Sequence, residues 1–313
     1  TGTGMASGKK GVVGVIGLGI MGGAFAQNLV SGDWRVIGYD VDPARRRAMA
    51  RAGVEVAADA ASVAREARDV ITSLPNPAAL TATAAAIAKA RVPRRVIIEA
   101  STFTIEDKAK AAAALRKAGH VMLDCPVSGT GAQAKVKDLV VYASGESKEI
   151  KRLRPVFADF TRGLYEVGEF GNGSRMKYVA NLLVAIHNVA SAEAMVLGMK
   201  AGLPAQLVHD LVKAGVGTSR VFELRAPMMV KNDYKQATMK ISVWQKDMDV
   251  IGSYARKIHV RTPMFDATKA IYKKALSSGR GAEDTASVCA VLEKMAGVKR
   301  GRTKKAKAPA AQK

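Results

Sequence analysis

The chain has 313 residues and 48% of them are hydrophobic, which is enough for two domains that each have a core. Its formal net charge of +22 suits anionic ligands, or loose attraction to nucleic acid. No apolar run reaches the roughly 20 uninterrupted residues of a membrane span. The two cysteines form no CxxC pair and the four histidines are scattered. We therefore predict a cytoplasmic protein with no metal site and no membrane partner.

Short β-branched runs alternate with Ala-, Arg- and Glu-rich stretches through the first half of the chain. Strands are expected at 12–16, 36–39, 70–74, 96–99, 121–124 and 139–143. Helices are expected between them, at 23–30, 44–52, 78–90 and 105–118. This alternation requires crossover connections, so it predicts an α/β domain with a doubly wound, mostly parallel sheet of the Rossmann type.

The pattern becomes helical after about residue 171. Helices are expected at 174–200, 204–214, 219–229, 240–257, 263–277 and 284–295. The last fifteen residues hold seven basic side chains and no apolar periodicity, which is typical of a solvated tail. We therefore predict a dinucleotide-binding domain at 11–173, an all-helical domain at 174–298 and a disordered basic tail at 299–313. A solvated tail explains the charge, so no nucleic-acid partner is predicted.

A GxGxxG sequence follows the first expected strand and precedes a helix. Its residues are Gly17, Leu18, Gly19, Ile20, Met21 and Gly22. The first glycine permits a tight turn, the second lets a pyrophosphate approach the backbone, and the third lets helix and strand pack closely. The helix N-terminus offers free N–H groups to an anion. Together these features predict a dinucleotide site.

Asp40 ends the second expected strand, at the distance from the glycines where an acid binds the adenosine ribose. A carboxylate there repels the additional phosphate of NADP. Arg45, Arg46 and Arg47 follow, and an arginine can accommodate that phosphate. We expect these arginines to form a solvated helix start. NAD is therefore the predicted cofactor, and NADP stays open.

Several separate motifs then occur in one order: GLGIMGGAFAQNL at 17–29, DCPVSG at 124–129, GNGSRMK at 171–177 and KD at 246–247. From about residue 11 to 296 the chain resembles the β-hydroxyacid dehydrogenase family of the 6-phosphogluconate dehydrogenase superfamily. That resemblance implies hydride transfer between a nicotinamide and a small anionic 3-hydroxy acid or semialdehyde. It also implies a homodimer or homotetramer.

The resemblance implies a role for each matching residue. Lys177 corresponds to the family's catalytic lysine, and Asn181, one helical turn later, would hold the substrate hydroxyl beside it. Ser128, Gly129 and Thr130 would bind the substrate carboxylate. Leu74, Pro75 and Thr102 would flank the nicotinamide half of the cofactor, and Lys246 would lie beside it.

Oxidation of a hydroxy acid requires a base such as this lysine. Removing a hydroxyl proton requires a base, and lysine, with an ordinary pKa near roughly 10.4, must be made partly neutral by burial or by a neighbouring cation such as Lys246. In the reductive direction the charged form would polarise the carbonyl and return the proton.

The substrate loop departs from the family pattern, because Thr130, Gln133 and Lys137 stand where glycine is common. We expect these side chains to reshape the pocket, which leaves the substrate open. Two other functions also remain. An imine reductase would resemble this chain but usually lacks the lysine, and a non-catalytic dinucleotide-binding protein could use the basic tail to bind nucleic acid.

Overall fold

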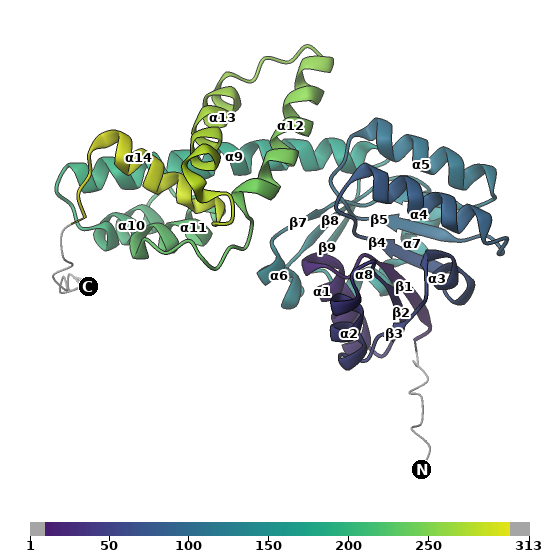
Figure 1. Cartoon of the computed structure of the whole chain (residues 1–313). Coiled ribbons are helices and arrows are strands. Elements are labelled where there is room, and N and C mark those ends of the chain that lie inside the picture. The colour runs from purple at the N-terminus through teal and green to yellow at the C-terminus, as the bar shows by residue number, and fades with distance from the viewer. Residues whose placement is uncertain (1–9, 301–313) are drawn as a thin grey trace. The chain divides into compact units, whose positions relative to one another are not determined.

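The computed structural model describes residues 10–300, in two compact units. The first unit ends at Ala180 and the second begins at Asn181. Helix α9 (Asn172–Lys200) belongs to both, because the chain passes from one unit to the next within it (Figure 1). This division lies seven residues after the boundary expected at 173/174, so the first two turns of α9 group with the α/β unit.

Six parallel strands form the main sheet of the first unit, in the order β3-β2-β1-β4-β5-β6. They are β1 (Val12–Ile16), β2 (Arg35–Tyr39), β3 (Glu55–Val56), β4 (Asp69–Thr72), β5 (Val96–Glu99) and β6 (Val121–Asp124). This order reverses direction between β1 and β4, and ligands of such sheets bind at the carboxyl ends of the strands at that reversal. The predicted Rossmann-type sheet is confirmed.

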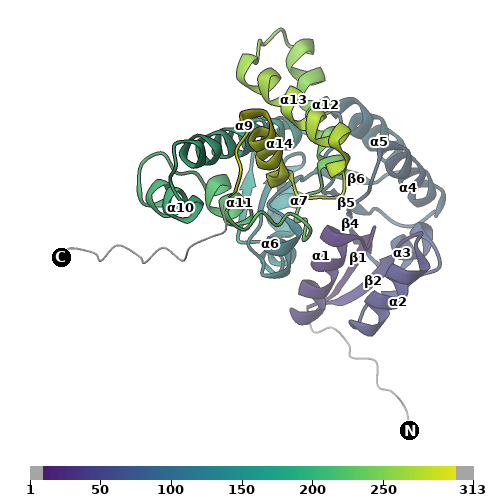
Figure 2. The same cartoon turned by 60° about the vertical axis from the view of Figure 1, so that its left-hand side comes forward.

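Helices cover both faces of this sheet. The helices of the first face are α1 (Ile20–Ser31), α7 (Ser147–Arg152) and α8 (Arg154–Ala158), while α3 (Ala60–Glu66), α4 (Pro77–Lys89) and α5 (Ile105–Lys117) pack on the other face. Helix α2 (Pro43–Arg51) follows β2. Each face of the sheet has its own hydrophobic core, and side chains alternate between the faces along each strand. Val13 and Val15 of β1 therefore pack under α1, and Ile16 packs in the core of the other face. Figure 2 shows α3 and α4 from a second side.

A second, three-stranded sheet holds the sixth expected strand, which we had placed in the main sheet. Its strands are β7 (Val127–Ser128), β8 (Val140–Ala143) and β9 (Gly163–Glu166), with β7–β8 antiparallel and β8–β9 parallel. The short helix α6 (Gly131–Lys135) lies between β7 and β8 in the chain. An isolated bridge between Asp124 and Ser144 joins the end of β6 to this small sheet.

The second unit is helical throughout the described residues, as predicted. After α9 come α10 (Ala205–Ala214), α11 (Arg220–Lys231), α12 (Ile241–Lys257), α13 (Pro263–Ala275) and α14 (Val288–Ala296), with short π and 3-10 segments at Leu276–Arg280 and Thr285–Ser287. Within α9, Asn188 donates hydrogen bonds to the Tyr272 hydroxyl (2.8 Å) and the Thr285 carbonyl oxygen (2.9 Å). Asn188 therefore links α9 to α13 and to the 3-10 segment before α14.

Helix α9 is long and apolar enough to cross a membrane by length and composition alone, a property that the sequence reading had not recognised. Lys177, Asn181 and Asn188 are nevertheless buried along it. A helix whose polar side chains hydrogen-bond to surrounding protein is typical of a protein core. We therefore interpret α9 as a core helix.

The predicted tail begins too early at residue 299. The Arg300 guanidinium donates hydrogen bonds to the carbonyl oxygens of Met229 (2.6 Å) and Val230 (2.9 Å), in the last turn of α11, and pairs with the buried Glu293 carboxylate. The Met229 carbonyl oxygen also accepts the N–H of the C-cap residue Asn232 at 3.3 Å, so Arg300 adds donors at an end of α11 where backbone partners run out. Residues 301–313 lie outside the described residues.

We expect a chain that ends at Val298 to lose about 1–3 kcal/mol of unfolding free energy, because the Glu293 carboxylate loses its cation and the two carbonyl oxygens lose the Arg300 guanidinium. A chain that ends at Arg300 should keep the thermal midpoint of the full chain. Calorimetry on the three lengths checks this, and equal midpoints for all three would show that Arg300 contributes nothing.

Candidate active site

The glycine loop is shaped so tightly that side chains would not fit. Gly17 has φ 89°, and its N–H donates to the Tyr39 carbonyl oxygen at 2.8 Å. A Cβ on Gly17 would lie 2.1 Å from the Ser73 carbonyl oxygen, and one on Gly22 would lie 1.9 Å from the Gly17 carbonyl oxygen. The loop therefore brings the ends of β1 and β4 and the start of α1 into direct backbone contact, as the GxGxxG pattern predicts.

This loop fits the pyrophosphate of a dinucleotide. Gly19 is the N-cap of α1, and no side chain caps that helix end. The first N–H groups of α1 are therefore available to an anion, and the helix dipole adds positive potential there. The loop also lies at the reversal of strand order, where such cofactors bind.

Asp40 is buried at the end of β2 and supports the same loop. Its Oδ2 accepts the Leu18 N–H at 2.7 Å, and its Oδ1 accepts the Asp42 N–H at 2.8 Å. The Arg45 guanidinium lies 3.5 Å from Oδ2 and half of its side chain is exposed. Arg46 donates to the Asp40 carbonyl oxygen at 2.6 Å. The three arginines lie at the start of α2, where Arg45 and Arg47 are exposed as predicted, and Arg45 and Arg46 in addition contact Asp40.

We expect Asp40→Ala to shift the ratio of kcat/KM for NADP over NAD upward by about tenfold, the change that roughly 1.4 kcal/mol produces. The variant removes the charge that repels a 2′-phosphate and releases Arg45. Asp40→Asn is the control for loop structure, because its amide oxygen can still accept the Leu18 N–H. An unchanged ratio in both variants would remove Asp40 from cofactor selection.

The loops after β4 and β5 are tied together beside this site. The Leu74 N–H donates to Ser101 Oγ at 2.9 Å, and Ser101 is itself fixed by its N–H bond to Glu99 at 3.0 Å. Thr102 follows on the second loop and is partly buried, while Pro75 is exposed. The structure therefore brings together the two loops that we predicted to flank the nicotinamide.

The predicted substrate loop needs one correction. The Thr130 N–H donates to Gln133 Oε1 at 3.0 Å, so Thr130 is the N-cap of α6 and its N–H already has a partner. Gln133 also donates to Asp138 at 3.0 Å. Gln133 therefore stabilises the loop from within. Ser128, Gly129 and the hydroxyl of Thr130 remain the candidates for holding a carboxylate.

Lys177 lies in the second turn of α9 and only 8% of its surface is exposed. The helix start is fixed from the α/β unit: Asp124 Oδ2 accepts the Ser174 N–H (2.8 Å), and Ser144 Oγ accepts the Gly173 N–H (3.0 Å). A Cβ on Gly173 would lie 2.4 Å from the Tyr142 carbonyl oxygen. This close approach explains the second glycine of the GNGSRMK motif.

In the second unit, Asn181 and the Lys246-Asp247 pair come together. Buried Asn181 donates from Nδ2 to Asp247 Oδ2 at 3.0 Å, and Lys246 Nζ lies 3.7 Å from Asp247 Oδ1. Asp247 therefore orients both residues that the sequence singled out. The sequence reading had given Asp247 no role, although it is half of the KD motif. Trp244 is buried and lies against Tyr272, so it belongs to the core.

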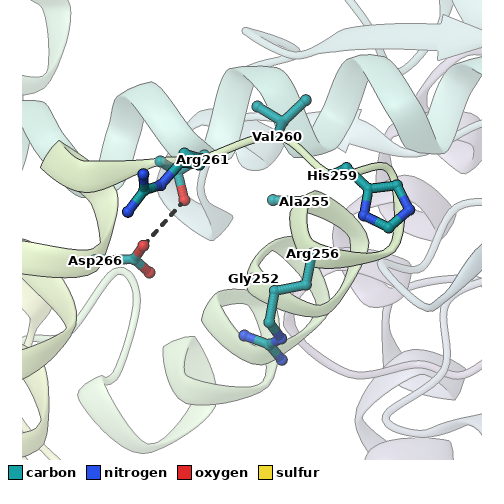
Figure 3. A pocket seen from close by; sticks show the side chains of 8 residues that line it. Gly252, Ala255, Arg256, His259, Val260, Arg261 and Asp266 are labelled. Carbon is teal, nitrogen blue, oxygen red and sulfur yellow. Dashed lines mark hydrogen bonds between the residues drawn. The ribbon is translucent and has the colours of Figure 1, made fainter.

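Two other features of the described residues do not join this site. Cys125 is fully buried, and burial raises the pKa of its thiol, which makes it an unreactive packing residue, as its position predicts. A pocket between α12 and α13 is lined by Arg256, His259, Arg261 and Asp266, and it includes none of the predicted site residues (Figure 3). Among residues 10–300, no group of three His, Cys, Asp or Glu side chains could hold a metal.

Comparison with known proteins identifies the family. Residues 12–168 match the NAD-binding domain of 6-phosphogluconate dehydrogenase, and residues 171–292 match the NAD-binding domain of NADP-dependent 3-hydroxyisobutyrate dehydrogenase. The chain belongs to the β-hydroxyacid dehydrogenase family. As a member of this family it is an NAD(P)-dependent oxidoreductase, so the predicted family and cofactor class are confirmed.

The relatives of this β-hydroxyacid dehydrogenase are similar over their whole length. L-threonate dehydrogenase of Haemophilus influenzae is 31% identical over 92% of this chain and 97% of that protein. Glyoxylate/succinic semialdehyde reductase 1 of Arabidopsis thaliana is 28% identical over 88% and 96%. The structure of 3-hydroxyisobutyrate dehydrogenase (ygbJ) from Salmonella typhimurium superposes with a TM-score of 0.81 at 28% identity, covering 90% and 99%. A Streptomyces aurantiacus imine reductase, at 21% identity and a TM-score of 0.60, shares the fold.

Proposed function

We propose that this chain oxidises a small 3-hydroxy acid, or reduces the matching semialdehyde, with Lys177 as the general acid and base. The observation that carries the proposal is a buried lysine on a helix whose first turn is hydrogen-bonded to the end of β6. A lysine so placed has little freedom to move and little water around it. Both conditions favour controlled proton transfer.

Each predicted site residue has one role in this reaction. In oxidation the neutral amine of Lys177 accepts the hydroxyl proton, and in reduction its ammonium form returns it. Asn181, fixed by Asp247, would hold the hydroxyl. Ser128, the Gly129 N–H and the Thr130 hydroxyl would bind the carboxylate. The nicotinamide of NAD or NADP, when bound, takes or returns the hydride. Leu74, Pro75 and Thr102 would enclose that ring, and Lys246 would lie beside the cofactor.

The substrate is best sought among short hydroxy acids. Several relatives at 29–31% identity are named L-threonate dehydrogenase, so L-threonate comes first in the assay. 3-Hydroxyisobutyrate, glyoxylate and succinic semialdehyde follow, each tested with NAD and NADP by nicotinamide absorbance. We expect turnover with at least one acid or aldehyde of this class and preference for NAD. No turnover with any of them would reject the proposal.

We also propose that the chain forms a homodimer or homotetramer through α9. Met176, Val179, Leu183 and Leu197 are exposed on this helix, and their successive spacings of three, four and fourteen residues place them on one face. Exposed large apolar side chains gathered on one face of a helix are typical of a contact surface. Light scattering after size-exclusion chromatography tests this, and a monomer at assay concentrations would exclude it.

A further inference from the structure

Three charged side chains meet in the core beneath the start of α9. Lys108 on α5 lies with its Nζ 2.7 Å from Glu99 Oε2, at the end of β5, and 2.7 Å from Asp124 Oδ1, at the end of β6. Each of the three residues is 0% exposed. A fully buried lysine is rare unless it is paired, and here it has two carboxylate partners. Neither the motifs nor the proposed reaction gives Lys108 a role.

The charges of this cluster depend on one another. Burial opposes the charged form of Lys108, but the Asp124 and Glu99 carboxylates outweigh it, so the pKa of Lys108 is raised. Tyr178 and Cys125 also interact electrostatically with the cluster, and burial raises the pKa of each, which keeps both neutral. The three charged side chains therefore carry a net charge of −1, two carboxylates against one ammonium.

Asp124 connects this cluster to the first turn of α9. Its Oδ1, which accepts from Lys108, also accepts the Ser174 hydroxyl at 2.8 Å. Its Oδ2 accepts the Ser174 N–H at 2.8 Å and lies 3.3 Å from Ser144 Oγ. The carboxylate thus binds the positive end of the α9 dipole and two donors of one residue. Lys177 is three residues after Ser174, on the same side of the helix.

We propose that Lys108 is a positioning residue: by holding Asp124 against Glu99 it fixes the first turn of α9, and through that turn the Lys177 amine. This inference rests on the proposed function, because it assigns Lys108 to the same reaction. Lys108 itself is buried in the core and touches neither substrate nor cofactor in this role. It acts on the reaction only through the ordering of the 172–177 segment.

Removing the Lys108 ammonium group should make the stability of the protein depend more strongly on pH. In Lys108→Met, two buried carboxylates face each other with a net charge of −2, so one of them will bind a proton with a raised pKa. A carboxyl whose pKa is higher in the folded than in the unfolded chain stabilises the fold at low pH and loses that contribution as the pH rises. The unfolding free energy of the variant should therefore be closest to that of the parent at about pH 5 and furthest below it at about pH 8.

The double variant Glu99→Gln/Lys108→Met returns the cluster to a net charge of −1. The amide oxygen introduced by Glu99→Gln can still accept the Ser101 N–H, which Glu99 accepts at 3.0 Å in the parent. Lys110→Met is the matched control, because Lys110 lies on the same helix, two residues away, and is exposed. The glycine loop and Asp40 are untouched in all of these variants.

The test measures kcat and amide hydrogen exchange of 172–180 in the full chain across this pH range. At about pH 8 we expect Lys108→Met to lose on the order of tenfold to a hundredfold in kcat, as small misplacements of a catalytic group do, and to exchange faster at 172–180. The double variant should regain most of both, and Lys110→Met should match the parent. If Lys108→Met does not fold, the double variant alone must show parent-like exchange and turnover.

Two results would overturn the inference. The first is a kcat of Lys108→Met within about twofold of the parent at every pH. The second is a loss of kcat with unchanged exchange at 172–180, in either variant. The exchange result is independent of the reaction, so a failure of the proposed function, seen as full turnover in Lys177→Ala, is distinguishable from a failure of the Lys108 inference.

Discussion

Lys177→Ala should lower kcat for oxidation by a factor of about 10²–10⁴, the contribution that a positioned general base makes. The buried amine is the group we assign to hydroxyl deprotonation, and alanine supplies no base. NAD affinity should be unchanged, because the glycine loop and Asp40 lie elsewhere in the α/β unit. Steady-state kinetics and fluorescence titration with NADH measure the two quantities separately.

Arg175→Ala is the matched control for charge, because Arg175 is an exposed cation two residues earlier on the same helix. It should retain turnover within a few-fold. If Lys177→Ala retains near-parent kcat, or if the control loses as much as it does, the assignment of Lys177 as general base is wrong.

Arg225→Met should destabilise the helical unit by about 3–5 kcal/mol, the cost of breaking a buried ion pair from one side. Arg225 Nη1 lies 2.6 Å and 2.7 Å from the two oxygens of Asp284, and the Asp284 side chain is fully buried. Asp284 also accepts the N–H groups of Thr238, Met239 and Ala286. It therefore fastens the segment before α12 to the segment before α14, and the variant leaves its charge without a counterion.

A loss of that size should lower the thermal midpoint of the helical unit by roughly 10 °C. Differential scanning calorimetry measures it. Arg280→Met is the control, since Arg280 pairs with Glu283 at 2.6 Å in a partly exposed position and such pairs contribute about 1 kcal/mol or less. Equal shifts of the thermal midpoint in the two variants would show that the buried Arg225–Asp284 pair stabilises the protein no more than a partly exposed pair does.

Local sequence patterns predicted most of the architecture. The strands at Val12–Ile16, Val96–Glu99 and Val121–Asp124 occur at the predicted residues, because each is a short, mostly apolar and buried run that begins with valine. The glycine loop was predictable for a similar reason, since close backbone approach at Gly17 and Gly22 requires glycine there. Strands of two residues, such as β3 and β7, are too short to produce a pattern and were missed.

Contacts between distant segments were beyond the sequence reading. Lys108 resembles any lysine of a charged helix, and its burial follows only from the placement of β5 and β6 beside α5. Asp124 was quoted as part of a motif, but its bond to Ser174, fifty residues later, depends on the fold. Likewise, Gln133 was expected to reshape the pocket, and its bond to Thr130 is a capping geometry that a substitution pattern does not reveal.

The pH dependence of kcat/KM for hydroxy-acid oxidation tests the central claim most directly, because it reports the ionisation of the essential base in the free enzyme. For the parent chain we expect the rate to rise with pH through one ionisation and then level off. The residual activity of Lys177→Ala should lack that rise. A variant profile that keeps the rise at parent amplitude would show that another group is the base, and would contradict the account.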